Sequence, residues 1–450
     1  MAQSFLPEFG SLSQHSLPTW FADAKFGLFS HWTVGSVPAY AAVGKDPFTL
    51  AREEGEEKAF SHTPYAEWYW NSINIPGSPA ARHHAEVWGN CDYAEFVQRF
   101  FAASQGWDAS RWSHLMSASG AKYCVAVTKH HDGVLYWPSE TPNPHRGPTW
   151  SSSRDLVGEC AQAARSAGLR FGVYYSGGID WTFQGLGIRN WSSLFAAIPQ
   201  DDEYHRYADG HWRELIRRYQ PDVLWNDIGY PGFGDGAAGV IADFYNGNPQ
   251  GVVNDRFDVL GVLGRTAHAD FRTPEYTTSH DSQGQYFEVC RGIGTSFGYT
   301  RDEDDSTYMP IPDLIGMFVD IVADGGNLLL NYGAMPSGEI PWDQQIRLMA
   351  MGQWLRVNGA AIYGSRPFEQ SRLITDEGHS VRLTRGADGA VYAMVRGRPE
   401  TAALTITGLP KGDVHLLGYG DQLLRQGDRV QLPTPPDSTP VFTLRIAVDR

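Results

Sequence analysis

Two adjacent histidines and an aspartate, His130, His131 and Asp132, form a compact group of reactive side chains. They follow the apolar run 123–128, which has the composition of a buried parallel strand. In α/β sheets and barrels, ligands bind at the carboxyl ends of such strands. Imidazole and carboxylate groups at that place can transfer protons, bind a metal ion or hydrogen-bond a polar ligand.

The same arrangement recurs where other β-rich runs end in polar or aromatic side chains. The runs cover residues 25–30, 170–175, 222–225, 252–253 and 327–330, and they end at His31 and Trp32, at Ser176, at Asn226 and Asp227, at Asn254 to Arg256, and at Asn331 and Tyr332. Because the carboxyl ends of parallel strands meet at one rim, we expect these side chains to surround a single active site.

Segments of helical periodicity separate these strands. We predict helices over residues 93–104, 154–167, 203–219, 237–245, 312–322 and 344–358. Asp92 is a suitable N-cap for the first of them. Strands that alternate with helices of this length indicate βα units around a parallel sheet. We therefore predict an α/β fold, a (β/α)8-like (TIM) barrel, over residues 1–362.

Residues 363–450 have a different pattern. Short alternating runs lie near Val381, Val391, Leu404, Val414, Val430 and Phe442, with Gly-rich and Pro-containing turns between them. This pattern predicts a C-terminal antiparallel β-sandwich domain. It contains no catalytic group of residues, so we expect it to support the barrel or to contribute to the rim of the substrate site.

Composition narrows the classes of function. The 450 residues are 42% hydrophobic and 19% charged, enough for a large core, and the net charge of −15 argues against nucleic acid or anionic membrane as a partner. We see no 20-residue apolar stretch and no leader, so we expect a cytoplasmic protein, or a periplasmic or extracellular one if a leader was trimmed. The four cysteines lack CxxC spacing and are expected to be free thiols. A homo-oligomer is compatible with the sequence.

The aromatic residues point to a substrate class. Phe, Trp and Tyr make up 13% of the chain. Residues 67–70 read Glu-Trp-Tyr-Trp, and Trp32, Trp137, Trp181 and Trp225 lie next to strand ends. Aromatic faces combined with short polar groups suit a sugar, so Trp225 and its counterparts are candidate sugar contacts.

Cleavage of a glycosidic bond in such a site needs two carboxyl groups, one ionised and one with a raised pKa. Asp227 is the candidate nucleophile, because it closes an apolar strand where it would be desolvated and point inward. Glu275 is the candidate acid/base; it follows a run over 268–271 that we predict as a strand, and Pro274 stiffens its approach. Glu288 and Glu67 are the alternatives for this second role.

Together these motifs resemble the retaining α-L-fucosidases of glycoside hydrolase family 29. The matching segments are, in order, 20–27 with His31 and Trp32, 36–39, 67–69, 129–133, 154–159, 221–227, 296–299, 325–331, 354–355, 358–359 and 361–364. Thr33 stands where the family usually has Gly, and Phe297 where it usually has Trp, which we expect to affect acceptor preference.

The resemblance implies an exo-acting α-L-fucosidase that hydrolyses terminal α-L-fucosyl residues of fucosylated glycans by retaining double displacement, with transfucosylation as a side activity and no metal or organic cofactor. It implies Asp227 as the nucleophile and Glu275 as the acid/base, with their carboxyl groups about 5–5.5 Å apart. The residues implied to bind or surround the sugar are His31, Glu67, Trp68, His130, His131, Tyr175, Arg256 and Phe297.

Two other functions use the same residues. A metal-dependent hydrolase on this barrel would take its ligands from His31, His130, His131, Asp132 and Asp227, and EDTA would inactivate it. A non-catalytic carbohydrate-binding protein would keep the pocket without turnover. The presence of both Asp227 and Glu275 argues against that function.

Overall fold

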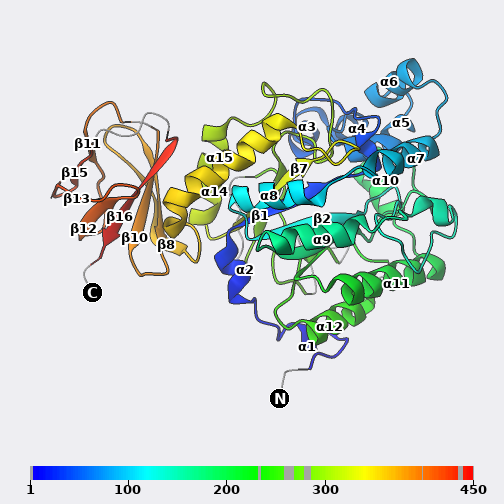
Figure 1. Cartoon of the computed structure of the whole chain (residues 1–450), viewed down its shortest axis with the longest axis horizontal. Coiled ribbons are helices and arrows are strands. Elements are labelled where there is room, and N and C mark those ends of the chain that lie inside the picture. Colours follow the sequence, from blue (N-terminus) through cyan, green and yellow to red (C-terminus); the bar gives the residue numbers. More distant parts are fainter. Residues whose placement is uncertain are drawn as a thin grey trace.

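A parallel β-sheet forms the centre of the larger part of the molecule (Figure 1). The computed structural model describes residues 4–231, 235–257, 268–277, 285–397, 399–433 and 439–448. Seven strands hydrogen-bond in the order β5-β4-β3-β2-β1-β7-β6. Their bounds are β1 Phe26–His31, β2 Tyr123–Lys129, β3 Arg170–Ser176, β4 Val223–Asp227, β5 Val252–Val253, β6 Glu288–Gly292 and β7 Asn327–Gly333.

Nearly every residue of these strands is buried, as expected for parallel strands covered on both faces. The six predicted barrel strands are therefore confirmed. The sequence analysis missed β6, because its run of Glu288, Cys290, Arg291 and Gly292 lacks the apolar composition of the other strands.

A short irregular segment connects the two edges of the sheet. Asp270 N donates to Val253 O of β5 at 3.0 Å, and Cys290 N of β6 donates to Pro274 O at 3.0 Å. The segment makes only isolated bridges, including Asn254 to Phe271, so the strand predicted over 268–271 is wrong as a regular element. Pro274 has no N–H to donate, and Tyr276 has a positive φ of 49°. With this segment in the eighth position, the seven strands form a TIM-like barrel.

Helices surround the sheet (Figure 1). They are α1 Phe9–Leu12, α2 Thr19–Ala24, α3 Pro47–Glu54, α4 Glu56–Ser61, α5 Tyr69–Ile73, α6 Pro79–Val87, α7 Tyr93–Ser104, α8 Ala109–Ser119, α9 Leu156–Ser166, α10 Trp191–Ala196, α11 Asp202–Tyr219, α12 Ala238–Gly247, α14 Ile311–Ala323 and α15 Trp342–Asn358. The six predicted helices are confirmed, each within two residues at both ends. Asp92 caps α7 by accepting from Ala94 N at 2.8 Å. None of the helices in the described ranges is long and apolar enough to cross a bilayer.

Short 3-10 helices occur in several loops. They are η1 Val34–Ser36, η2 Ala66–Trp68, η3 Pro148–Trp150, η4 Asp235–Ala237, η5 Asp255–Phe257 and η6 Gly359–Ala361. Of these, η2 precedes α5 and η5 follows β5. Both carry side chains that we describe below.

The chain after α15 forms two antiparallel sheets, ordered β13-β12-β16-β10-β9-β8 and β11-β15-β14. Their strands are β8 Arg366–Ile374, β9 Ser380–Arg385, β10 Val391–Arg396, β11 Ala403–Thr405, β12 Asp413–Leu416, β13 Gln422–Leu423, β14 Arg425–Gln426, β15 Arg429–Gln431 and β16 Val441–Ala447. This confirms the predicted antiparallel β class. The sequence analysis missed β8, because most of its residues are exposed and no apolar alternation marks it.

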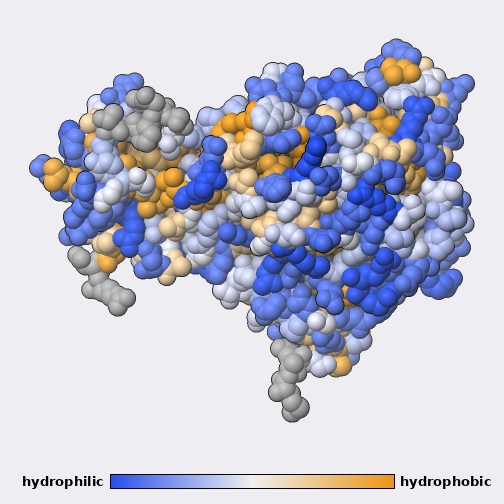
Figure 2. All heavy atoms as spheres, viewed as in Figure 1, coloured by the Kyte–Doolittle hydropathy of each residue, from blue (hydrophilic) through white to orange (hydrophobic). Residues whose placement is uncertain are grey.

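Helix α14 joins the two parts through a row of ion pairs. Asp313 and Asp320 of this helix, and its C-cap Asp324, pair with arginines of the antiparallel sheet, Arg396 at 2.6 Å, Arg382 at 2.6 Å and Arg372 at 2.5 Å. In Figure 2 apolar residues gather over α14 and α15 beside these sheets.

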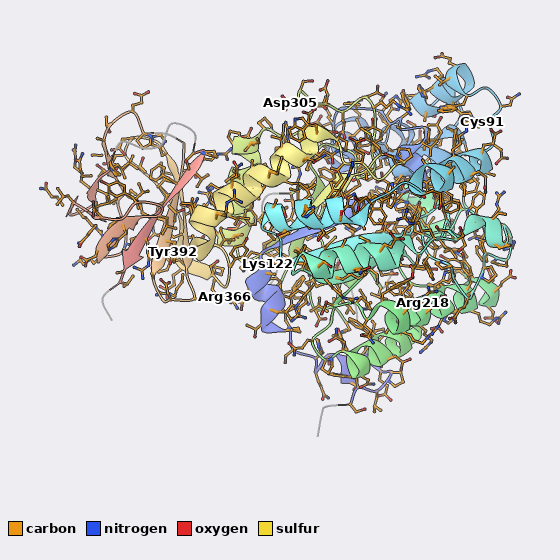
Figure 3. The ribbon with its side chains drawn as sticks, in the orientation of Figure 1. Cys91, Lys122, Arg218, Asp305, Arg366 and Tyr392 are labelled. Atoms are coloured by element: carbon orange, nitrogen blue, oxygen red, sulfur yellow. The ribbon has the colours of Figure 1, made fainter. Side chains whose placement is uncertain are left out.

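A second connection runs from β8 to α2. Arg366, labelled in Figure 3, pairs with Asp23 at 2.8 Å. In addition, the Trp354 indole N–H of α15 donates to Val441 O at 2.7 Å. The antiparallel sheets are thus fixed to the barrel by both charged and buried contacts.

Candidate active site

One guanidinium connects the two carboxyl groups that the sequence analysis singled out. Arg256 Nη1 lies 2.9 Å from Asp227 Oδ1, and Arg256 Nη2 lies 2.6 Å from Glu275 Oε1. Asp227 ends β4, Arg256 belongs to η5 after β5, and Glu275 belongs to the irregular segment in the eighth position. Arg256 is held in turn by Thr273 Oγ1 at 2.8 Å and lies over the Trp225 ring at 4.7 Å. The barrel rim therefore brings both carboxyl groups to one place.

The two carboxyl groups have different surroundings. The Tyr174 hydroxyl donates to Asp227 Oδ2 at 2.7 Å, and the Tyr65 hydroxyl donates to Glu275 Oε2 at 3.3 Å. Burial raises the pKa of Glu275, Arg256 lowers it, and the nearby charge of Asp227 raises it again, with a net rise. A carboxyl group with a raised pKa beside a paired carboxylate is the arrangement that general acid catalysis requires.

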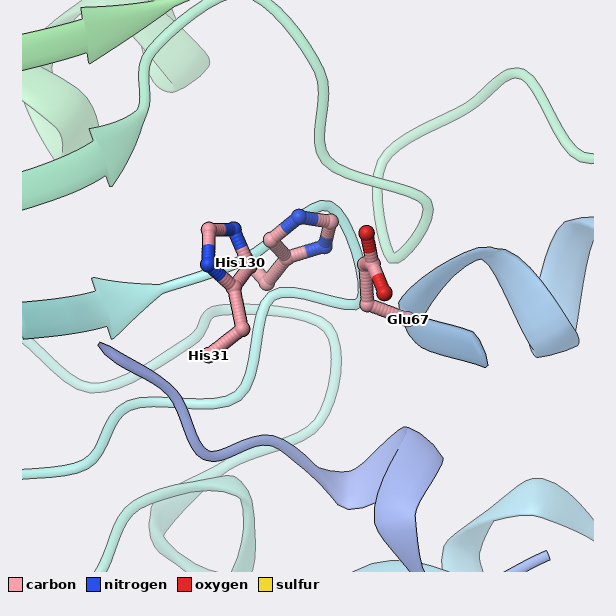
Figure 4. A group of neighbouring side chains, drawn as sticks. All are labelled: His31, Glu67 and His130. Carbon is pink, nitrogen blue, oxygen red and sulfur yellow. The ribbon is translucent and has the colours of Figure 1, made fainter. Parts of the chain in front are cut away.

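His31, Glu67 and His130 also come together (Figure 4). Their possible ligand atoms all lie within 4.8 Å of one another, and all three residues are buried. Burial lowers the pKa of His31 to about 4 and that of His130 well below its ordinary value, and it raises the pKa of Glu67 to about 8. At neutral pH the cluster therefore consists of neutral imidazoles and a protonated carboxyl group.

Hydrogen bonds to the protein fix the orientation of two imidazoles. Asn331 donates its amide to Phe297 O at 2.6 Å, so its Oδ1 accepts from His31 Nδ1, also at 2.6 Å. Ser176 donates to a backbone carbonyl, so its Oγ accepts from His131 Nδ1 at 2.6 Å. In both rings Nε2 is left as an acceptor, which suits the hydroxyl group of a ligand.

A cavity of about 620 Å³ opens onto the carboxyl groups. Its inner lining includes Asp227, Glu275, Trp68, His131 and Tyr65. The Trp68 ring meets His131 edge-on, with centroids 5.2 Å apart. The volume falls in the range of about 300–1,000 Å³ that is typical of small-molecule sites. Phe297 is absent from this lining; it lies behind Tyr65, with ring centroids 5.2 Å apart, and its ring centroid is 5.0 Å from that of His31.

Tyr175 does not reach this site, contrary to the sequence prediction. Its hydroxyl pairs with His211 Nδ1 of α11 at 2.9 Å, on the outer face of β3. Neighbouring side chains of a strand point to opposite faces, so Tyr174 is the residue that faces Asp227. Tyr174 lies in register with Trp225, and Ser176 with Asp227. Tyr174 and Ser176 are two positions apart and therefore share a strand face, and this spacing from the polar strand end would have identified Tyr174.

Tyr65 is a second residue that the sequence analysis missed. It lies just before η2, in a segment without strand or helix periodicity, and it reaches Glu275 across 210 positions of the sequence. No local pattern predicts such a contact, because it depends on how the η2 loop folds over the rim.

Glu288 and Trp225 lie deeper in the barrel. The Trp225 indole N–H donates to Glu288 Oε1 at 3.1 Å, and the Tyr123 hydroxyl donates to Glu288 Oε2. Glu288 is completely buried, and it is absent from the lining of the 620 Å³ cavity. Glu288 is therefore an internal support. Trp225 contacts Arg256 and does not line the cavity.

The ligand set considered for a metal-dependent hydrolase is not brought together as predicted. Asp132 accepts from the Tyr93 hydroxyl at 2.9 Å and from Val134 N at 3.1 Å, so it anchors its own loop. Asp227 pairs with Arg256. Within the described ranges, the group with metal-ligand spacing is the cluster of His31, Glu67 and His130.

Comparisons with known proteins agree along almost the whole chain. A family model described as Alpha-L-fucosidase matches residues 1–360. The plasma α-L-fucosidase of Homo sapiens is 32% identical over 469 residues, covering 96% of this chain and 89% of that protein. The α-L-fucosidase of Dictyostelium discoideum is 29% identical over 463 residues, covering 99% and 92%.

Solved structures agree as well. The crystal structure of Thermotoga maritima α-fucosidase in complex with a mechanism-based inhibitor is 37% identical, with a TM-score of 0.85, covering 98% of this chain and 99% of that one. A T. maritima α-L-fucosynthase is 36% identical, with a TM-score of 0.87, covering 99% and 100%.

Proposed function

The chain belongs to the alpha-L-fucosidase family, and on that premise we propose how its residues divide the work of the reaction. It is a glycoside hydrolase, an exo-acting α-L-fucosidase of the retaining type that acts on fucosylated glycans. The observation that supports the assignment of roles is the Arg256 bridge, which holds Asp227 and Glu275 together at the cavity.

In the first step, protonated Glu275 donates its proton to the glycosidic oxygen while an Asp227 oxygen attacks C1 of the fucosyl group. The bond between C1 and the leaving oxygen breaks, and an ester links the sugar to Asp227. In the second step, the Glu275 carboxylate takes a proton from water, the water oxygen attacks C1, and Asp227 is released as a carboxylate. A sugar hydroxyl in place of water gives transfucosylation.

In this proposal His31, Glu67 and His131 bind the fucosyl group. His31 and His131 offer Nε2 as acceptors, and the protonated Glu67 offers a donor, so together they match the alternating needs of sugar hydroxyls. Trp68 supplies an aromatic face, and Phe297 packs near the methyl group. None of these contacts requires a charged imidazole.

A metal-dependent hydrolase is the second candidate, favoured by the spacing of His31, Glu67 and His130. The Arg256 contact to Asp227 speaks against it, because a cation bonded to the carboxylate opposes metal binding there. Dialysis against EDTA separates the two functions: the glycosidase keeps its activity, and the metal enzyme loses it.

The test of the proposal is release of 4-nitrophenol from 4-nitrophenyl α-L-fucopyranoside by the wild type, Asp227→Ala and Glu275→Ala. We expect Asp227→Ala to be inactive, and azide to restore turnover in Glu275→Ala with formation of an α-fucosyl azide, because two inversions at C1 retain its configuration. Inactive wild type contradicts the function and favours a non-catalytic carbohydrate-binding protein. A Glu275→Ala variant with full activity transfers the acid/base role to Glu67 or Glu288.

We also propose a domain boundary and a cellular location. The boundary between a barrel domain, 1–362, and a β-sandwich domain, 363–450, is supported by the change from parallel to antiparallel sheets. A cytoplasmic location is supported by the free thiols of Cys91, Cys124, Cys160 and Cys290, which are typical of a reducing compartment. Size-exclusion chromatography tests for a homo-oligomer.

A further inference from the structure

The outer wall of the cavity is apolar and aromatic, unlike its inner end. Phe48 of α3, Phe60 of α4, and Trp191, Leu194 and Phe195 of α10 line it. These three short helices lie near one another at the same end of the barrel in Figure 1. Phe48 is 42% exposed and Trp191 is 39% exposed, although both face a cavity. Large apolar side chains left open in this way mark a binding surface.

A row of rings connects this wall to the reacting groups. From His131, which lies 3.9 Å from Asp227, the ring centroids step 5.2 Å to Trp68, 6.0 Å to Phe60 and 5.3 Å to Trp191. Each step is an edge-to-face contact, the arrangement that aromatic pairs prefer. The wall is therefore a direct extension of the site rather than a separate surface.

The wall is also held in place. Trp191 N donates to Glu56 Oε2 of α4 at 3.0 Å, which ties α10 to α4. At the start of α10, Asn190 Oδ1 accepts from Ser193 N at 2.7 Å and forms a capping box. A platform fixed by these bonds loses little conformational entropy when a ligand binds.

The distribution of charge restricts the ligand. Among the described residues that line the cavity, the charged ones are Asp227, Asp255, Arg256 and Glu275, all at the inner end. In the part of the outer wall that the structure describes, no lining residue offers a cation for a carboxylate, sulfate or phosphate group. Its aromatic faces suit a flat, uncharged and weakly polar surface instead.

We propose that Trp191, with Phe48 and Phe60, forms the binding site for the leaving group, and that it selects uncharged groups with a flat apolar face. An aryl ring and the C–H face of a hexopyranose share this chemistry. The proposal rests on the proposed function: with the fucosyl group on the inner cluster and its glycosidic oxygen at Glu275, the leaving group extends along the outer wall.

The experiment compares substrates that differ only in the leaving group. Wild type, Trp191→Ala and Trp191→Phe are assayed with 4-nitrophenyl α-L-fucoside, with a fucosylated neutral hexoside and with α-L-fucosyl fluoride, whose leaving atom is too small to touch the wall. We expect Trp191→Ala to lower kcat/KM about tenfold for the first two substrates. For the fluoride we expect an unchanged value, and Trp191→Phe should retain most of the activity on all three.

Trp342→Ala is the matched control, because Trp342 is an equally large exposed ring, 64% exposed, outside the cavity lining. An equal loss on all three substrates in Trp191→Ala overturns the proposal, as does no loss on any. A loss on the aryl substrate alone restricts the site to aryl groups and contradicts the hexopyranose part. Inactive wild type on all three substrates contradicts the proposed function itself, which is a different outcome from any of these.

Discussion

Two glutamates of the same barrel, Glu275 and Glu288, show how similar electrostatics can serve different ends. Burial raises the pKa of both, that of Glu288 to about 7. The Glu275 side chain keeps 12% of its surface exposed and contacts Arg256, whereas Glu288 has no exposed surface and is enclosed by Tyr123 and Trp225. A raised pKa alone therefore does not identify a catalytic acid; access to the cavity and a charged partner are what favour Glu275 for the proposed role.

The largest effect on activity should come from substitution of Asp227, which contacts the same guanidinium, that of Arg256, as Glu275. We expect Asp227→Ala to lower kcat on 4-nitrophenyl α-L-fucoside about 10⁴-fold, because no covalent intermediate forms without the carboxylate. Steady-state kinetics measures the loss, and circular dichroism checks the fold. Retention of a tenth or more of the wild-type rate removes Asp227 from the nucleophile role.

Glu275→Gln should lower kcat/KM by about 10²–10⁴ on a natural fucoside, the usual contribution of general acid–base catalysis. The loss should be smaller on 4-nitrophenyl fucoside, because 4-nitrophenolate leaves without protonation. A ratio of the two losses near one contradicts the acid role. Glu288→Gln, the deep counterpart, is the control and should show neither loss.

The pH dependence of kcat/KM tests the feature that separates Glu275 from Glu288, its contact with Arg256. In the proposed mechanism Glu275 is protonated in the first step, so its pKa should set an alkaline limb in kcat/KM, above the ordinary range of a glutamate. The positive Arg256 lowers that pKa. Arg256→Met should therefore lower kcat/KM about tenfold and move the alkaline limb to higher pH. An unmoved limb assigns it to another group, of which Glu67, with a pKa of about 8, is the first to test by Glu67→Gln.

The smallest effect on activity, within about threefold, is expected for Glu288→Gln, whose consequence lies in stability. The folded protein holds this proton up to a pKa of about 7, while the unfolded chain releases it near 4.5, so wild-type unfolding free energy falls as pH rises between these values. Deprotonation of Glu288 should lower the free energy of unfolding by on the order of 3 kcal/mol across this pH range. Urea unfolding at pH 5 and pH 8 should show a smaller difference in the variant; an equal difference contradicts a protonated Glu288.

Much of the fold was predictable because local patterns carry it. The strands β1 to β4 and β7 are apolar runs, and Asp92 and Asp227 stand where a cap and a strand end require them. The choice between Tyr174 and Tyr175 was not predictable from composition, since it depends on which face of β3 turns inward. That face is set by the register with β4, a contact between distant parts of the chain.

The same limit applies to the second carboxyl group. Glu275, Glu288 and Glu67 are equivalent as residue types, and only the tertiary structure separates a cavity wall from an enclosed interior. The position of Tyr65 opposite Glu275 depends likewise on loop packing. Sequence patterns locate the strand ends, and long-range contacts decide which of their side chains meet.

The irregular segment in the eighth position is the part of the barrel whose length can change most easily. Neighbouring strands are locked by continuous ladders, in which the insertion of one residue would turn every following side chain to the opposite face. The stretch from Phe271 to Tyr276 is held by single bridges, so a residue gained or lost there would change the reach of Glu275 without shifting Asp227 on β4. The proposed proton donor can thus be repositioned for a new leaving group while the proposed nucleophile stays where it is.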